Sequence, residues 1–196
     1  AIASIRLRDV PNYEDQTSYS FGLVARDKSG SETQEIFFIE VVDLNDAPVF
    51  VSDALATIPE NNESGSFVYQ PVFFDEDGDV LSVSLGGDDQ ERFFIDPISH
   101  EVRLLETADY ELKSSYSLIV LATDGVDEIR QAITVSVEDV NEAPVLLSEL
   151  ALFVPENTAI NSMVISLTAS DPDDDVLIYS MSGADSSLFQ LNADTG

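Results

Sequence analysis

The sequence predicts an all-β protein made of tandem Greek-key antiparallel β-sandwich repeats of about 96 residues each. Three observations lead to this fold class. Several motifs recur along the chain at one constant step, apolar residues alternate with polar ones in short runs, and no segment carries the apolar stripe of about 3.6-residue period that marks an amphipathic helix. With 44% apolar residues, the 196-residue chain can bury a core in each complete repeat.

The repeat is visible in three motifs. Each of them recurs after 96 residues: residues 43–49 match 139–145, residues 59–61 match 155–157, and residues 75–79 match 171–175. A step of this length is that of a whole domain rather than of a solenoid unit. The chain therefore divides into the back half of one repeat (residues 1–46), a complete repeat (47–142) and the front half of a third (143–196).

Alternating apolar residues predict the strands and their buried faces. Equivalent runs of this kind are Tyr19, Phe21, Leu23, Ala25 with Tyr116, Leu118, Val120, Ala122; Phe37, Ile39, Val41 with Ile133, Val135, Val137; and Leu81, Val83, Leu85 with Leu177, Tyr179, Met181. Gly, Asp, Asn and Pro turns separate the runs, which indicates about seven short strands per repeat.

The charge of the chain restricts its partners. Asp and Glu number 38 against 8 Lys and Arg, a formal net charge of -30 at pH 7, which repels nucleic-acid phosphates and anionic lipid surfaces. The sequence has no apolar run long enough to span a bilayer, so we expect no nucleic-acid partner and no direct insertion into a membrane. Because the chain has no Cys, its stability must come from its core or from a bound metal.

The acidic residues gather where predicted repeats meet. Calcium takes about six to eight oxygen ligands from carboxylates, amides and carbonyls, so several Asp, Glu and Asn must converge to bind it. Such residues follow the last predicted strand of each of the first two repeats: Asp43, Asn45 and Asp46 at a first junction, and Asp139, Asn141 and Glu142 at a second. In sandwiches that run end to end, these residues meet the loops of the next repeat, which predicts a calcium site at each junction.

Acidic residues can also arise without a junction site, in two ways. One is a solvated acidic surface, and we assign the scattered acids Asp88, Asp89 and Glu91 to it. The other is an EF-hand that begins at Asp75, but that loop requires Gly and Glu where Val80 and Gly86 stand. The spacing therefore excludes the EF-hand.

Five motifs, taken in this order, resemble the cadherin repeat family. They are residues 59–61 (PEN), residues 109–111 (where the family commonly has Asp-Arg-Glu), residues 122–124 (AxD), the linkers 43–47 and 139–143 (DxNDN-like), and Asp171 with Asp173 (DxD). The resemblance covers essentially the whole chain and implies a cadherin/immunoglobulin-like sandwich with bound Ca2+. The short loop 75–79 and the lack of an N-terminal Trp are more similar to the bacterial type of the family.

The resemblance also implies metal ligands by position. At the first junction it implies Glu14, Asp43, Asn45, Asp46, Asp75, Asp77 and Asp124, together with Asp27, the equivalent of Asp124 in the first half-repeat. At the second junction it implies Glu60, Asp109, Glu111, Asp139, Asn141, Glu142, Asp171 and Asp173. Two positions depart from the family: Asn12 replaces the Asp expected two places before Glu14, and Glu142 replaces a linker Asp.

These features favour a structural and adhesive function. We expect repeats that stiffen the extracellular stalk of a secreted or surface protein and support calcium-dependent adhesion. The alternative is a module that binds polysaccharide or like repeats, for which each ring pair at 37–38, 73–74 and 93–94 would expose one Phe. We expect no enzymatic activity, since His100, the single histidine, is more typical of a turn than of a Ser-His-Asp site. The two half-repeats complement each other, which predicts head-to-tail self-association between chains.

Overall fold

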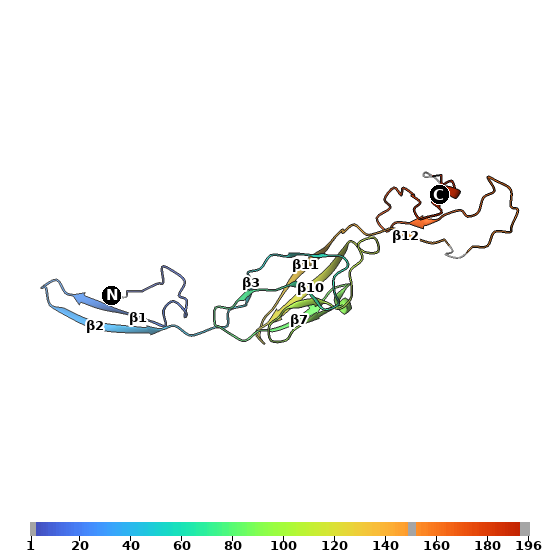
Figure 1. The fold of residues 1–196 in the computed structure, drawn as a ribbon. Helices are drawn as coiled ribbons and strands as arrows, with labels where there is room; N and C mark the ends of the chain where they lie inside the picture. The colour runs from blue at the N-terminus through green and yellow to red at the C-terminus, as the bar shows by residue number, and fades with distance from the viewer. Residues whose placement is uncertain (1–2, 149–151, 193–196) are drawn as a thin grey trace. The chain divides into compact units, whose positions relative to one another are not determined.

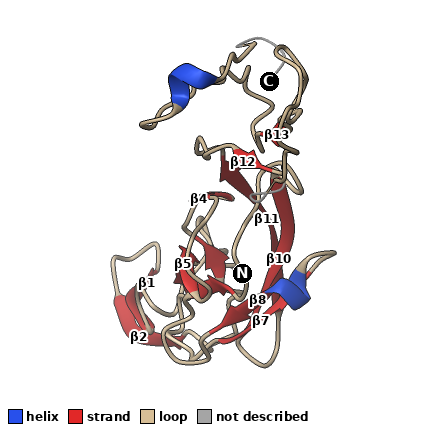
Figure 2. Ribbon diagram, turned by 45° about the vertical axis from the view of Figure 1, so that its right-hand side comes forward, coloured by secondary structure: helices blue, strands red, loops and turns tan. Residues whose placement is uncertain are grey.

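The structure is a computed structural model, and it describes residues 3–148 and 152–192. Strands and loops make up nearly all of the described chain (Figure 2), with two single-turn 3-10 helices, η1 (Gln90–Arg92) and η2 (Ser186–Leu188). The all-β prediction is therefore confirmed. No helix in the described part of the chain is both long and apolar enough to cross a membrane. The outer ends of the two predicted half-repeats, residues 1–2 and 193–196, lie outside the described residues, as do residues 149–151.

Two antiparallel sheets form the sandwich of the central part of the chain. The four-stranded sheet has the order β4 (Leu55–Pro59), β11 (Glu128–Glu138), β10 (Ser115–Thr123), β7 (Ser82–Gly86). The three-stranded sheet has the order β5 (Ser66–Tyr69), β9 (Val102–Leu104), β8 (Phe93–Ile95), and β3 (Val49–Phe50) pairs separately with β6 (Phe73–Phe74). Strands β7, β10 and β11 lie side by side in Figure 1.

The core of this sandwich consists of the residues that the alternation placed inside. On β10 and β11 the buried side chains are Tyr116, Leu118, Val120, Ala122, Ile133, Val135 and Val137, each at most 5% exposed. The second sheet contributes Val68, Phe93, Val102 and Leu104. Burial of each large apolar side chain stabilises the fold by roughly 1.5–3 kcal/mol, so the two buried faces account for the stability of the sandwich.

The hairpin of β1 (Ser18–Arg26) and β2 (Glu32–Glu40) has the same pattern but an uncovered face. Phe21 and Phe37 stack across the strands with ring centroids 5.8 Å apart. Leu23 is nevertheless 42% exposed and Phe37 45% exposed, whereas their equivalents Val120 and Ile133 are buried. The prediction that these residues face inward is not met here, because no second sheet packs on the hairpin in the described chain.

The part of the chain after residue 142 has one short sheet, in which β12 (Val145–Leu146) pairs with β13 (Ala169–Ser170). The strand predicted over residues 177–181 does not form. Its equivalent, β7, is held in its sheet by β10, and residues 177–181 have no such partner strand among the described residues.

Local geometry recurs at the step of 96 residues. The pairing of β3 with β6 is repeated by β12 with β13, and η1 is repeated by η2. Asn61 and Asn157 both have a positive φ, of 56° and 64°, and so do Gly78 and Asp174, at 75° and 60°. These left-handed positions shape the loops that carry the acidic motifs.

By its contacts the chain divides into two compact units. The first contains residues 1–56, 64–106 and 117–135, and the second contains residues 57–63, 107–116 and 136–196. All residues of the first candidate junction described below lie in the first unit, and all of those of the second junction lie in the second unit.

Asp89 differs from its assignment to surface charge. The side chain is 9% exposed, and its Oδ2 accepts a hydrogen bond of 2.8 Å from the backbone N–H of Ser117 on β10. That assignment is wrong because this carboxylate fastens the turn before η1 to the neighbouring strand.

Candidate metal centres

At the second junction the structure brings four carboxylates together. One carboxylate oxygen each of Glu60, Glu111, Asp139 and Asp173 lies within 4.8 Å of the others. Glu60 follows β4, Glu111 precedes β10, Asp139 follows β11 and Asp173 follows β13. Four segments far apart in the sequence thus supply one ligand each, as the motif order predicted.

Glu60 is the anchor of this group. Its side chain is buried, and the residue is only 3% exposed. Its Oε2 accepts a hydrogen bond of 2.7 Å from Tyr110 N–H, and its Oε1 accepts one of 2.7 Å from Val140 N–H. The Glu60 N–H donates to Glu138 O at 3.0 Å. Both donors to the carboxylate are neutral amides, so the negative charge of the group is not cancelled.

The other four residues predicted for the second junction lie outside this group. Asp109 Oδ1 accepts from Leu112 N–H at 2.8 Å, and Asp171 Oδ1 accepts from Asp173 N–H at 3.1 Å. The Asn141 side-chain amide donates to Glu142 O at 2.9 Å. Glu142 Oε1 accepts a hydrogen bond of 2.7 Å from Asn61 Nδ2, a partner that sequence analysis missed. Each of these side chains therefore holds a turn or a linker in this structure.

The first junction contains two smaller groups that share one residue. Glu14, Asp43 and Asp77 form one group, and Asp75, Asp77 and Asp79 form the other, each with ligand oxygens within 4.8 Å. Asp79 was not predicted as a ligand. The signal that could have found it is the alternation of Asp at positions 75, 77 and 79 on one short loop.

The remaining predicted residues of the first junction take part in hydrogen bonds around these groups. Asn45 Nδ2 donates to Asp124 Oδ2 at 3.0 Å and to Asp127 Oδ2 at 3.1 Å, and Asp127 is a residue that sequence analysis missed. Asp46 N–H donates to Asp77 Oδ2 at 2.7 Å. Asp27 Oδ1 accepts from the N–H groups of Ser29 and Ser31 within its own turn, and it belongs to neither group.

The two junctions share their linker geometry. Asp46 N–H donates to Asp77 Oδ2 at 2.7 Å, and the equivalent Glu142 N–H donates to Asp173 Oδ2 at the same distance. In the loops below them, Gly78 N–H donates to Asp75 O and Asp174 N–H donates to Asp171 O, both at 3.3 Å. The same backbone frame therefore presents the DxD carboxylates at both junctions.

Like charges raise the pKa of several of these acids. Desolvation, followed by the charges of Asp173 and Glu60, raises the pKa of Asp139 above its ordinary value. For Glu111, a hydrogen bond to its own backbone lowers the pKa, but desolvation and the charges of Glu60, Asp173 and Asp139 outweigh it, and the net change is upward. At the first junction the pKa of Asp46 is raised by desolvation and by Glu76, Asp77 and Asp43. Crowding of this kind favours the binding of a cation.

The donor set fits a hard divalent cation. All ligand atoms in the three groups are carboxylate oxygens, which calcium and magnesium prefer, and none is a Cys sulfur or a His nitrogen. Asp75 Oδ2 and Asp173 Oδ1 are buried and have no hydrogen-bond partner among the described residues. A buried oxygen without a donor is costly, and a bound cation would satisfy it. The groups can therefore hold a metal ion.

His100 occupies a turn, as predicted. Its φ is 59°, its N–H donates to Asp96 O at 2.9 Å, and its ring lies edge-on to Phe73 with centroids 6.0 Å apart. Asp96 Oδ1 accepts from Ile98 N–H and Ser99 N–H, and these hydrogen bonds lower the pKa of Asp96. Asp96 thus stabilises the turn rather than orienting the imidazole.

The fold and the acidic groups together define a class of protein: antiparallel β-sandwich repeats with clustered carboxylates at their junctions. Comparison with known proteins names the family. Residues 54–138 match the family model of the cadherin domain, and this part of the chain is a cadherin domain. The sequence relatives and structural neighbours of the chain are cadherins as well.

Among the sequence relatives is the mouse cadherin EGF LAG seven-pass G-type receptor 3, 33% identical over 211 residues that cover 98% of this chain and 6% of that protein. Another is mouse protocadherin Fat 2, 33% identical over 80% of this chain and 4% of that protein. A crystal structure of human protocadherin-24 EC1-2 aligns with a TM-score of 0.62 and 27% identity, over 77% of this chain and 78% of that one. The chain thus spans only a small part of these curated relatives.

The raised pKa values predict that cation binding releases protons. In the folded chain without cation, Asp139 and Glu111 keep protons to higher pH than free carboxyls do, so stability from these groups is present below the ordinary pKa and is lost as pH rises through the raised one. Calcium must displace those protons. We expect calorimetry in two buffers of different ionisation enthalpy to show more protons released at about pH 5 than at about pH 7. Equal release at both pH values would contradict this.

Proposed function

We propose that this chain consists of calcium-binding cadherin repeats that stiffen an extracellular segment of a surface protein and support calcium-dependent adhesion. The observation that carries this proposal is the convergence of Glu60, Glu111, Asp139 and Asp173 from four separate segments. A group of four carboxylates without a cationic partner in it repels itself unless a cation binds.

The residues that would hold the ions at the second junction are those four, with Asp173 Oδ1 as the buried atom that lacks a donor. At the first junction they are Glu14, Asp43, Asp75, Asp77 and Asp79. A bound calcium ion supplies two positive charges that offset the repulsion among these side chains. Glu60, through Tyr110 and Val140, holds the loop and the linker in the position that the ion requires.

The organisation into a back half-repeat (1–46), a complete repeat (47–142) and a front half-repeat (143–196) is part of this proposal. The local features that recur 96 residues apart support it. An extracellular or cell-surface location and secretion of the parent protein follow from the same proposal. The bacterial type, which the short loop 75–79 favours, stays a prediction, since the relatives named above are mammalian.

A calcium titration tests the proposal. We expect calorimetry to show several binding events and the melting temperature to rise, with each site contributing about 2.7 kcal/mol when free calcium is about 100 times its Kd. The variant with Asp139→Asn and Asp173→Asn should lose the second junction, whereas Glu91→Gln, an exposed acid outside the groups, should behave as the wild type. If calcium neither binds nor changes the melting temperature, the acids are a solvated surface and the proposal fails.

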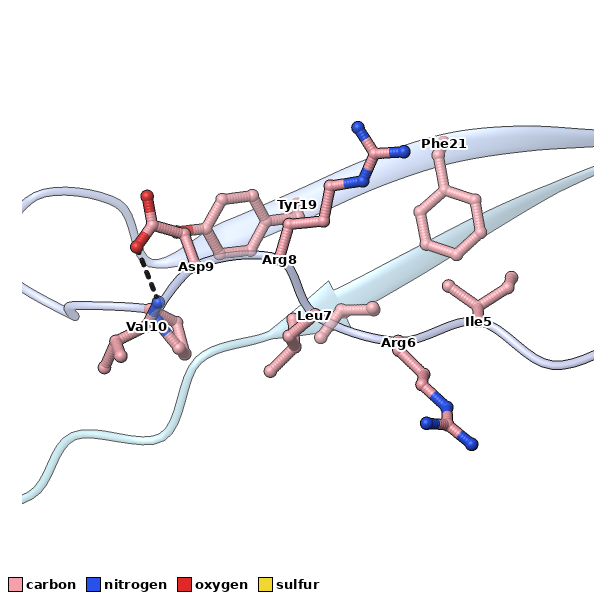
Figure 3. A pocket seen from close by; sticks show the side chains of 10 residues that line it. Ile5, Arg6, Leu7, Arg8, Asp9, Val10, Tyr19 and Phe21 are labelled. Atoms are coloured by element: carbon pink, nitrogen blue, oxygen red, sulfur yellow. Dashed lines mark hydrogen bonds between the residues drawn. The ribbon is translucent and has the colours of Figure 1, made fainter.

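A second interaction is favoured by the open face of the β1–β2 hairpin. A groove of about 440 Å³ lies on it, and Figure 3 shows the side chains of Ile5, Leu7, Tyr19 and Phe21 gathered there. We propose that residues 152–192 of a second copy cover this face, as the front half-repeat does within the complete repeat. Charge supports this choice, because the groove includes Arg6 and Arg8, and residues 152–192 carry six Asp and Glu but no Lys or Arg.

Head-to-tail association should appear as a mass that grows with concentration. Because the contact joins two different surfaces, it can extend into a chain of molecules or close into a ring. We expect Ile39→Asp, on the open face, to keep the protein monomeric, while Phe38→Asp on the opposite side of the same strand leaves association intact. A wild type that light scattering shows to be monomeric at all concentrations would contradict this proposal.

A polysaccharide-binding role remains a prediction with one supporting observation. Phe38 is 77% exposed, and Phe74 and Phe94 are also exposed, each next to a Phe that is less so. Phe67 and Phe94 flank Arg103 in one row across β5, β9 and β8. Exposed rings of this kind can stack on apolar sugar faces. Saturable binding of a polysaccharide, lost in Phe94→Ala, would support this role.

A further inference from the structure

Asn12 and Asp109 occupy equivalent turns at the two junctions. Asn12 Oδ1 accepts from Asp15 N–H at 2.9 Å, and Asp109 Oδ1 accepts from Leu112 N–H at 2.8 Å, three residues on in both cases. The backbone carbonyl of Asn12 accepts from Gln16 N–H at 3.1 Å, and that of Asp109 accepts from Lys113 N–H at 2.9 Å. The two side chains therefore stand in the same position, two residues before Glu14 and Glu111 respectively.

The two side chains differ in their second polar atom. In Asp109 this atom is a carboxylate oxygen, which can ligate a cation. In Asn12 it is the amide nitrogen Nδ2, which is a donor only, and it donates to Glu76 Oε1 at 2.7 Å. Asn12 therefore links its turn to the loop of the DxD motif by a hydrogen bond that needs no cation.

The groups around the two positions differ in the same direction. At the second junction four carboxylates converge and one of them, Glu60, is buried and held by two backbone amides. At the first junction the group that contains Glu14 has three carboxylates, two of them exposed. Fewer charges and less rigid ligands both lower the affinity of a calcium site.

We propose that Asn12 makes the first junction a weaker calcium site that is partly held together without calcium, so that the second junction fills first. This inference rests on the proposed function. As calcium rises, the second junction stiffens at a low concentration. The first junction depends on the Asn12–Glu76 hydrogen bond until a higher concentration is reached.

The test compares Asn12→Asp with its mirror, Asp109→Asn, in the chain as it is. To observe one junction at a time, the first is titrated in a background of Asp139→Asn and Asp173→Asn, and the second in a background of Asp43→Asn. We expect Asn12→Asp to tighten calcium binding at the first junction by about tenfold and Asp109→Asn to weaken the second by a similar factor. Calorimetry gives the affinities, and the melting temperature in chelator gives an independent readout.

In chelator, Asn12→Asp should lower the melting temperature, because a carboxylate then faces Glu76 where an amide donated to it. The control is Glu76→Ala, which removes the hydrogen bond but keeps the amide of Asn12. It should lower the melting temperature in chelator without tightening calcium binding at the first junction. The two variants therefore separate the loss of the hydrogen bond from the gain of a ligand.

Two failures are distinguishable. If the second junction binds calcium but Asn12→Asp leaves the affinity of the first unchanged, or if both wild-type junctions bind with equal affinity, the inference is wrong and the proposed function stands. If neither wild-type junction binds calcium, the proposed function fails and the inference fails with it.

Discussion

Replacing Glu60 by Ala is expected to lower the free energy of unfolding of the calcium-free chain by about 2–5 kcal/mol and to abolish calcium binding at the second junction. The carboxylate is buried and accepts from the N–H groups of Tyr110 and Val140. Each buried donor left without an acceptor costs about 1–3 kcal/mol. Urea unfolding in chelator measures the first effect and calorimetry the second.

Two controls accompany this prediction. Glu60→Gln keeps one side-chain oxygen as an acceptor and removes the charge, so it should cost less stability than Glu60→Ala while still weakening calcium binding. Glu91→Ala removes an exposed acid and should change stability by about 0.5 kcal/mol or less. A Glu60→Ala variant as stable as Glu91→Ala would show that the buried hydrogen bonds do not hold the loop and the linker.

The second large effect is expected from Leu118→Ala in the core of the complete repeat. Leu118 is 1% exposed and lies on β10 between the buried Tyr116 and Val120. Removing its side chain loses apolar burial and leaves a cavity, which costs about 2–5 kcal/mol. Thermal or urea unfolding, followed by far-UV circular dichroism, measures the loss.

The matched control is Leu23→Ala on the open face of β1. Leu23 belongs to the same alternating pattern but is 42% exposed, so in a dilute monomer the substitution should cost only about 0.5 kcal/mol. At high concentration a larger cost at Leu23 would agree with a second copy covering this face. Equal costs at Leu118 and Leu23 in the monomer would contradict the assignment of the core to the complete repeat.

Much of the fold could be predicted from the sequence because its signals are local. The alternation of Tyr116, Leu118, Val120 and Ala122 correctly identified both a strand and its buried face. The identical pattern at Tyr19, Phe21 and Leu23 predicted a strand correctly but not its exposure. Burial depends on a second sheet, and alternation within one strand carries no information about whether such a sheet is present.

The candidate sites were predicted in part. The motif order correctly brought Glu60, Glu111, Asp139 and Asp173 together. It did not separate these residues from Asp109 and Glu142, which the structure engages in a turn and in a hydrogen bond to Asn61. Hydrogen bonds between distant loops depend on where side chains point, and that direction is not encoded in the spacing of the motif.

The sequence by itself therefore determined the all-β class, the step of 96 residues, the strands of the complete repeat and the acidic motifs, since each is a pattern that can be counted along the chain. Only the tertiary structure decided which carboxylates converge, that Glu60 is buried, that Asp79 joins Asp75 and Asp77, and that Asn12 reaches Glu76. The physical reason is distance along the chain. Contacts between residues 64 positions apart, such as Asn12 and Glu76, arise from the packing of strands and loops and leave no local periodicity.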